Sequence, residues 1–315
     1  MLSQVALALI EEEKPFDAPN PRAPAARVIR SDEEAIAVAE DVAQQLALNA
    51  AERDRERRLP YAEMELVSDS GLLAITVPKD YGGAGVGAAT LARVIALLSA
   101  ADGSIGQIPQ NHFFMLEALR LAGTPEQKRF FYARILSGER IGNALSELGT
   151  KTAQDHATRI TRTAAGYRAD GKKFYSTGVL FAHWIAVVGS NENHKSLIAF
   201  LPRNTPGISV IDDWTGFGQR TTGSGSTVFE NAFAHPFSII PLHAVFDEPT
   251  SMGPLAQIMH AAVDLGIARG ALDETIVFVK KYTRPWKESG LAHGYEDPHI
   301  ISQIGEVAVS VEAAQ

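Results

Sequence analysis

Apolar and polar positions change their spacing twice along this chain. Between residues 31 and 136 the apolar residues recur at helical spacing, and from about 141 to 245 they alternate with polar residues in short runs typical of strands. From Gly253 onward the spacing is helical again. The pattern therefore predicts an α+β protein with an N-terminal helical domain, a central β domain and a C-terminal helical region.

Start and stop signals divide the first helical region. Ser31 and Glu34 form a capping box, because the hydroxyl can accept from a free N–H of the first turn and the carboxylate can reach back. We expect a helix over roughly 32–55, and another that begins at Pro60 and ends at Gly71. Further helices are expected after a loop at 77–85, over about 87–100, 105–122 and 125–136.

The middle of the chain predicts a set of short strands separated by turn signals such as Asp170-Gly171. The expected strands lie near 157–163, 166–170, 172–177, 183–190, 195–201, 207–213 and 226–233. Strands this short and this closely spaced favour an antiparallel barrel or sandwich.

Two helical segments follow the strands. The first runs from Gly253 to Thr283, and the second begins near Pro298. The second places an apolar stripe on one face, formed by Ile300, Ile304, Val307 and Val311. A lone amphipathic helix cannot bury such a face, so we expect a partner subunit or a further part of the bundle to cover it. The predicted division is an N-terminal arm (1–30), a helical domain (31–140), a β domain (141–246) and a partial helical domain (247–315).

Composition narrows the class of protein. The 315 residues are 45% apolar and 21% charged, which is ordinary for a soluble globular protein. A net charge of −8 argues against a nucleic-acid-binding face. The absence of cysteine excludes disulfides and Cys-ligated metals, and no His/Asp/Glu spacing suggests a metal site. No apolar run is long enough to span a membrane, and Met1–Ile10 lacks a basic leader region. We expect a cytoplasmic protein.

Two short segments carry the candidate chemistry. Asn143–Glu147 and Phe174–Gly178 each place small hydroxyl residues beside aromatic residues or glycines. A planar, amide-rich ring such as an isoalloxazine needs hydroxyl and N–H groups at its edge and an apolar surface against its face. The two segments are therefore a candidate flavin site.

Together with the order of the helical and β regions, these segments resemble the acyl-CoA dehydrogenase flavoprotein superfamily. Val77–Gly83 is similar to its Pro-x-x-Tyr-Gly-Gly loop, and Asn143–Glu147 to its Leu-Ser/Thr-Glu flavin strand. Phe174–Gly178, followed by Trp184, is similar to its Trp-Ile-Thr/Ser-Asn segment, and Gly266–Asp273 to the Gly-x-Ala-x-x-Ala start of its helical bundle.

Other positions depart from the members that oxidise acyl-CoA. Glu147–Thr152 stands where they carry Glu-Pro-Gly-Ala-Gly-Ser-Asp, and Arg284–Trp286 replaces Arg-x-x-Phe-Gly. No Asp or Glu lies between Gly253 and Ala261, where some members place the carboxylate that removes an α-proton. These departures resemble the reduced-flavin monooxygenase branch, which includes the dibenzothiophene monooxygenases and the sulfur-acquisition oxidoreductases of the SfnB family, and the SfnB family is the nearer likeness.

The resemblance implies a two-component monooxygenase that uses FMN, delivered as FMNH2, and O2 to oxidise a small organosulfur compound. A separate flavin reductase would supply the reduced flavin, because no Gly-x-Gly-x-x-Gly nicotinamide fingerprint is present. The resemblance also implies a homo-oligomer, a tetramer built as a dimer of dimers. An FAD-dependent acyl-CoA dehydrogenase is the alternative, and a non-catalytic protein of the same fold is a further one.

Particular residues are candidates for the site. By the resemblance, Asn143 and Ser176 are candidate catalytic hydrogen-bond donors near the flavin C4a/N5 edge. His112 lies on a helix that is expected to be buried, and it is a candidate proton donor near the substrate. The candidate flavin-binding residues are Leu145, Ser146, Thr152, Tyr175, Ser176, Thr177, Trp214 and Arg284. Structural alternatives stay open: Asn143 can cap a turn, and His112 can be a satisfied buried histidine. Trp214 can be a core aromatic, and Arg284 can cap the long helix.

Overall fold

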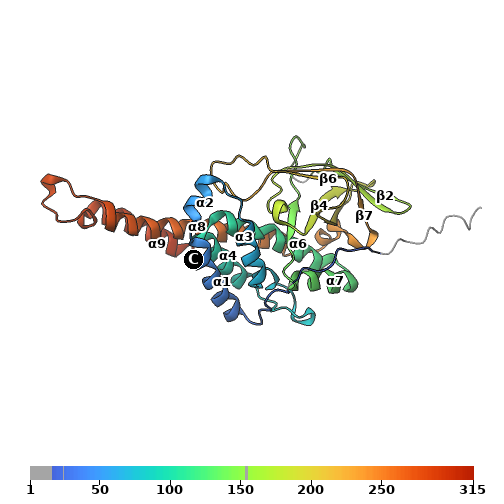
Figure 1. Cartoon of the computed structure of the whole chain (residues 1–315), viewed down its shortest axis with the longest axis horizontal. Coiled ribbons are helices and arrows are strands. Elements are labelled where there is room, and N and C mark those ends of the chain that lie inside the picture. The colour runs from blue at the N-terminus through green and yellow to red at the C-terminus, as the bar shows by residue number, and fades with distance from the viewer. Residues whose placement is uncertain (1–15, 24, 153–154) are drawn as a thin grey trace, which may run out of the picture.

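The computed structural model describes residues 16–23, 25–152 and 155–315 of the chain. Most of the predicted N-terminal arm therefore lies outside the described residues. The first helical region contains α1 (Asp32–Ala47), α2 (Ala50–Glu56), α3 (Tyr61–Asp69), α4 (Ala88–Ala101), α5 (Gly103–Gln107), α6 (Pro109–Ala122) and α7 (Pro125–Leu136) (Figure 1). The helix start predicted at Ser31 is confirmed, since Ser31 Oγ accepts from Glu34 N at 3.1 Å. The Glu34 carboxylate, however, accepts from Arg30 N rather than from Ser31 N, so the predicted capping box is only half formed. Thr124 forms a full capping box with Gln127 at the start of α7.

Two expected helices are each divided into two. The helix expected over 32–55 breaks between α1 and α2, where Leu48 is extended and Asn49 adopts a left-handed conformation with φ of 58°. The helix expected over 105–122 breaks at Pro109, which has no N–H to continue the hydrogen-bond ladder. Pro60 lies one position earlier than expected, as the N-cap of α3 rather than its first helical residue.

The strands of the described residues form one mostly antiparallel, eight-stranded sheet. Its path is β6-β7-β3-β2-β4-β5-β8, and β1 pairs in parallel with β4. The strands are β1 (Ile141–Ala144), β2 (Arg159–Thr163), β3 (Gly166–Lys173), β4 (Trp184–Ser190), β5 (Ser196–Pro202), β6 (Ile208–Ile211), β7 (Ser226–Ala234) and β8 (Ile239–Ile240).

The segment 166–177 differs from the expectation of two strands. One strand, β3, runs to Lys173 and contains a bulge where its register with β7 shifts between Ala169 and Gly171. The chain leaves the sheet after Lys173, so Phe174–Thr177 forms an irregular segment. This departure matters because it releases the Tyr175–Thr177 backbone to meet the end of β1.

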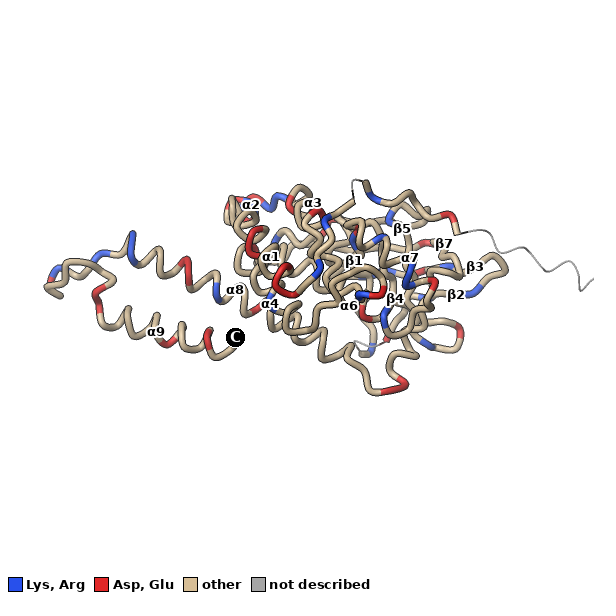
Figure 2. Tube along the Cα trace, turned by 90° about the horizontal axis from the view of Figure 1, so that it is seen from below, with Lys and Arg blue, Asp and Glu red and all other residues tan. Residues whose placement is uncertain are grey.

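The last two helices form a hairpin that projects from the body of the molecule (Figures 1 and 2). α8 (Met252–Tyr282) begins against the body, and α9 (Pro298–Ala313) returns along it. α8 can lie close to α4 because it carries glycines at the crossing: a Cβ on Gly266 would lie 2.3 Å from Ala96 O, and one on Gly270 would lie 2.4 Å from Ala100 O.

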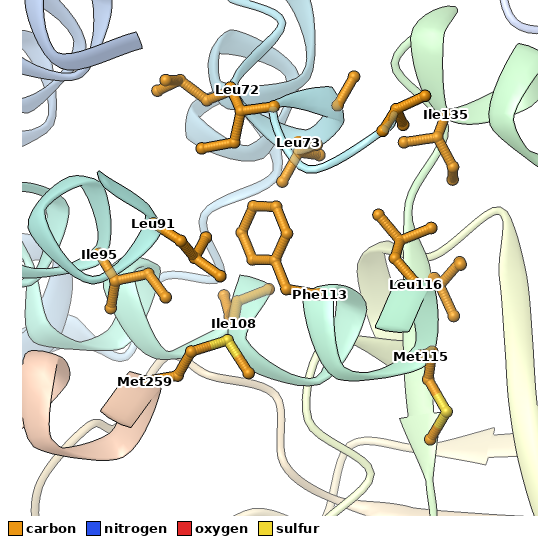
Figure 3. Packing of buried hydrophobic residues seen from close by; sticks show 14 of the residues in the cluster. Leu72, Leu73, Leu91, Ile95, Ile108, Phe113, Met115, Leu116, Ile135 and Met259 are labelled. Atoms are coloured by element: carbon orange, nitrogen blue, oxygen red, sulfur yellow. The ribbon is translucent and has the colours of Figure 1, made fainter. Parts of the chain in front are cut away.

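The main hydrophobic core joins the first helical region, the sheet and the start of α8. Figure 3 shows Phe113 of α6 between Leu72 and Leu73 on one side and Leu91, Ile108 and Met259 on the other. Trp184–Ser190, the whole of β4, is buried. Within the described part of the chain, no helix is both long enough and apolar enough to cross a membrane.

Candidate active site

The two predicted flavin segments lie side by side. Asn143, in β1, donates from its backbone N to Thr177 O at 3.1 Å and from its side-chain Nδ2 to Tyr175 O at 3.2 Å. A few residues further along, Phe174 N donates to Ser146 O at 2.9 Å. The fold therefore places the end of β1 and the segment after β3 along one another, although about 30 residues separate them in the sequence.

Two buried polar atoms at this junction have no hydrogen-bond partner within the described residues: Asn143 Oδ1 and Ser176 Oγ. The two residues are only 4% and 1% exposed. Tyr175 O can only accept a hydrogen bond, so the Asn143 amide nitrogen must face it and the amide oxygen is left free. An unpaired buried polar atom costs roughly 1–3 kcal/mol, and a ligand with polar edges would satisfy both atoms at this junction.

Tyr175 has a backbone conformation that is rare for an aromatic residue. Its φ is 50°, in the left-handed region, and its side chain is 54% exposed. The kink is closed by Thr177 N, which donates to Tyr175 O at 2.7 Å. It turns Ser176 inward and Tyr175 outward, where the Tyr175 ring meets the Trp214 ring edge-on at 6.1 Å. Strained backbone of this kind is concentrated at functional sites.

The loop before β7 packs against the second flavin segment, and its hydroxyl residues were not among the site residues predicted from the sequence. Thr177 Oγ1 and Ser224 Oγ are 2.7 Å apart, and Ser224 Oγ donates to Thr222 Oγ1 at 2.7 Å. Ser176 N also donates to Gly225 O at 2.9 Å. The glycine- and hydroxyl-rich run of residues 218–226 was visible in the sequence, but nothing local indicated which of its hydroxyls would meet Thr177.

His112 is locked by two backbone groups. Ile141 N donates to its Nδ1 at 3.1 Å, and its Nε2 lies 2.9 Å from Leu73 O, to which it donates. Burial lowers the pKa of His112 to about 4, so the ring is neutral. Because both ring nitrogens are engaged, this geometry favours the structural alternative over a proton donor to substrate. His112 fixes the start of β1 against the helical region.

Trp214 lines a cavity of about 580 Å³ together with Arg57, Asp212, Phe217 and Arg220. Its indole Nε1 donates to Gln219 O at 2.9 Å and its ring is half-buried, so Trp214 is not a core aromatic. Arg57 forms an ion pair with Asp212, which ties this loop to α2 and raises the pKa of Arg57. A second cavity, of about 440 Å³, lies between the 76–88 loop, α6 and the start of α8 and contains none of the predicted site residues.

The remaining candidates differ in position. Leu145 and Ser146 are half-buried directly after β1, at the junction. Thr152 is exposed in the following loop, where its N donates to Asp155 Oδ2 at 2.9 Å. Arg284 is exposed just beyond the far end of α8, and the helical rise places it roughly 37 Å along the helix axis from Met259. The structure of one chain therefore does not bring Arg284 to the junction.

Comparison with known proteins places this architecture in a family. The family description "Acyl-CoA dehydrogenase, N-terminal domain" matches residues 32–139, and "Acyl-CoA dehydrogenase, C-terminal domain" matches residues 258–315. The fold and the paired hydroxyl-bearing segments thus define an acyl-CoA dehydrogenase-like protein, as the sequence resemblance implied.

Individual relatives narrow the group. A dibenzothiophene monooxygenase of Rhodococcus erythropolis is 32% identical over 298 residues, which cover 90% of this chain and 71% of the relative. A probable FMNH2-dependent monooxygenase, SfnC, of Pseudomonas putida is 32% identical and covers 89% of this chain and 71% of the relative. The crystal structure of FMN-bound TdsC from Paenibacillus sp. A11-2 superimposes with a TM-score of 0.82 at 29% identity, covering 89% of this chain and 73% of TdsC. The chain belongs to the acyl-CoA dehydrogenase superfamily, in the branch that contains the dibenzothiophene monooxygenases.

Proposed function

We propose that this protein is a two-component flavin monooxygenase that uses FMNH2 and O2 to oxidise a small organosulfur compound. The observation that carries the proposal is the pair of unpaired, buried atoms Asn143 Oδ1 and Ser176 Oγ at the junction of the two candidate flavin segments. Relatives described as a dibenzothiophene monooxygenase, an FMNH2-dependent monooxygenase and an FMN-bound structure support it.

The residues at the junction fit a reduced flavin. Reduced isoalloxazine presents N–H donors and carbonyl acceptors at its edge, and Asn143 Oδ1 offers an acceptor while Ser176 Oγ offers both a donor and an acceptor. In this proposal Asn143 accepts from the flavin through Oδ1 rather than donating to it, because its Nδ2 already donates to Tyr175 O. Leu145, Ser146 and Thr177 supply backbone and hydroxyl groups beside these two residues, and Tyr175 and Trp214 supply aromatic surface.

When bound, reduced FMN supplies two electrons that activate O2. In the overall reaction one oxygen atom forms a new bond to the substrate sulfur, the other leaves as water with two protons, and FMNH2 becomes FMN. This chain binds and orients the flavin edge through Asn143 and Ser176. The Tyr175 and Trp214 rings also exclude water from the site, because oxygen activated there must not be lost to solvent.

The acyl-CoA dehydrogenase alternative needs a carboxylate base near the flavin. The first carboxylate of α8 is Asp264, which is exposed, and the helix has none between Gly253 and Ala261. That stretch of α8 therefore offers no carboxylate that could remove an α-proton, and this observation favours the oxygenase.

The proposal also covers the source of the reduced flavin, the cellular compartment and the oligomeric state. Reduced FMN comes from a separate reductase, and the protein works in the cytoplasm as a homotetramer, a dimer of dimers. Exposed apolar side chains on the α8–α9 hairpin support the oligomer, since large ones such as Phe278 (58%) and Val309 (70%) face solvent in a single chain. Arg284 can hold a flavin phosphate only across such an interface, because it lies far from the junction of its own chain.

The proposal is tested by supplying the protein with a flavin reductase, NADH, FMN and ¹⁸O2. Dibenzothiophene and dimethyl sulfide serve as a bulky and a small sulfur probe. The expected result is a sulfoxide or sulfone that carries ¹⁸O and forms only when FMN and reductase are both present. Oxidation of an acyl-CoA with an artificial electron acceptor, without labelled product from either sulfur probe, would contradict the proposal.

A further inference from the structure

A buried ion pair lies directly behind the junction of the two candidate flavin segments. It joins the Glu147 carboxylate to the Lys173 ammonium, and their side chains are 4% and 0% exposed. Glu147 ends the segment that follows β1, and Lys173 is the last residue of β3. The pair therefore spans the point from which the two segments run to the site.

Backbone groups satisfy both charges. Glu147 Oε2 accepts from Ala157 N at 2.7 Å, and Oε1 accepts from Thr158 N at 3.1 Å. Lys173 Nζ donates to Leu145 O at 3.0 Å. The hydrogen bonds with Lys173 and Thr158 outweigh the cost of burial and lower the pKa of Glu147, while burial lowers the pKa of Lys173. Three stretches of chain are thus fastened at one point: 145–147, 157–158 and the end of β3.

A buried ion pair is a weak device for stability alone. Removing two charges from water costs several kcal/mol each, and apolar residues of similar size often serve as well or better. The best supported use of such a pair is to fix one register among alternatives. Here the register concerns the site, because Phe174 N, next to Lys173, donates to Ser146 O, next to Glu147. A shift of one flavin segment along the other would displace Ser146 and Ser176 relative to each other.

We infer that Glu147 and Lys173 are positioning residues for FMN: they act through the backbone and hold the two flavin segments at the spacing that the ring requires. The inference rests on the proposed function. Neither side chain needs to touch the flavin: Glu147 ends the first flavin segment, Asn143–Glu147, and Lys173 directly precedes the second, Phe174–Gly178. Loss of the pair should therefore weaken flavin binding rather than binding of the sulfur compound.

The test uses the double variant Glu147→Gln/Lys173→Met, which keeps the size of both side chains and removes both charges, so that no lone charge is buried. The matched control is Glu126→Gln/Arg129→Met, which removes an exposed ion pair of α7. Reduced FMN is titrated anaerobically, and the KM for dimethyl sulfide is measured at saturating FMN in the reductase-coupled assay. Far-UV circular dichroism and thermal unfolding follow the fold.

The double variant should bind reduced FMN at least about tenfold more weakly, the scale on which misplaced supporting groups weaken sites. Its KM for dimethyl sulfide should stay near that of the wild type, and the control variant should match the wild type in both measurements. Damage that is merely structural would lower FMN affinity and raise the sulfur KM together. Should the double variant unfold, Glu147→Asp replaces it: the charge is kept and the spacing shortened, and the same selective loss of FMN affinity is expected.

Two failures can be told apart. If the wild-type protein itself does not bind reduced FMN, the proposed function falls and the inference falls with it. If the wild type binds reduced FMN and a folded Glu147/Lys173 variant binds it equally well, the proposed function stands and the positioning role is overturned.

Discussion

At His112 the charge state is set by burial. The ring sits between Leu73 O and Ile141 N, where a neutral imidazole satisfies both groups. Protonation would place a hydrogen on Nδ1 opposite the Ile141 N–H, turning an acceptor into a second donor. His112, a candidate acid in the sequence, therefore connects the helical region to β1 through these two hydrogen bonds, and its protonation should lower the stability of the fold.

We predict that His112 makes stability depend on pH between about 4 and 6.5. Its folded-state pKa, about 4, lies below the ordinary value. The contribution of the neutral ring is therefore complete above about pH 6.5 and is lost as the pH falls toward 4, up to roughly 3 kcal/mol. Urea unfolding of the wild type and of His112→Gln at several pH values in this window measures it. The stability gap between them should shrink as the pH falls, and a gap that does not change with pH would refute the prediction.

A second residue-scale prediction concerns the unpaired hydroxyl of Ser176. Ser176→Ala removes a buried polar atom that has no partner, so the flavin-free protein should be as stable as the wild type or slightly more stable. Oxygenation should fall by at least about tenfold, because the flavin edge loses a hydrogen bond. Ser238→Ala is the control: its buried Oγ donates to His235 O at 2.9 Å, so that variant should lose about 1 kcal/mol of stability and keep its activity. The opposite pattern in the two variants would contradict the role given to Ser176.

Much of the candidate site could be predicted from the sequence, and the rest depended on long-range contacts. Asn143 and Ser176 lie in recognisable segments, and the fold brings them together. Ser224 and the Glu147–Lys173 pair could not be assigned, because their partners are tens of residues away and only the folded sheet reveals them. The roles of all the site residues remain predictions that the variants above test.

At the scale of elements, boundaries that carry side-chain signals were predictable. The first helix begins after Ser31, α7 begins at Pro125 and α8 ends at Tyr282, each within one residue of the expected position. The break at Asn49 was not predicted, because a single left-handed residue interrupts an otherwise helical apolar pattern. β1 was recognised as a flavin strand but placed about two residues late, since its parallel pairing with β4 leaves no local turn signal.

The break at Asn49 gives an element-scale prediction. Asn tolerates the left-handed region better than other non-glycine residues, and glycine tolerates it best. Asn49→Val should destabilise the protein by about 1–2 kcal/mol, whereas Asn49→Gly should be close to neutral. Chemical denaturation of both variants provides the measurement. Equal losses in the two variants would show that the Asn49 side chain, rather than its backbone conformation, matters.

At the scale of the whole molecule, the α8–α9 hairpin is the feature that one chain does not explain. Val311 is buried against the hairpin partner and Ile300 and Ile304 are half-buried, so α8 covers part of the stripe predicted on α9. Val307 remains exposed, and Ile301 and Val309 add to the open apolar surface. The domain boundaries and the tetramer stay predictions, and the hairpin is where the tetramer can be tested.

We predict that charges placed on the open hairpin surface dissociate the oligomer. Phe278→Glu/Val309→Glu should shift the protein to smaller species, because burying two carboxylates in an interface is unfavourable. The body should stay folded, since both side chains are exposed in the single chain. Sedimentation velocity gives the mass, with Gln303→Glu as a polar control on α9. A wild type that is monomeric at micromolar concentration would contradict the tetramer directly.

In the proposed function, Asn143, Ser176 and their neighbours hold reduced FMN for a reaction with O2. The most direct measurement is an anaerobic titration of the protein with reduced FMN and, separately, reduced FAD, followed by rapid mixing with oxygen while the flavin absorbance is recorded. We predict preferential binding of reduced FMN and a transient absorbance that matches neither oxidised nor reduced flavin. Tight binding of FAD with no such transient would contradict the proposed function and favour an FAD-dependent acyl-CoA dehydrogenase.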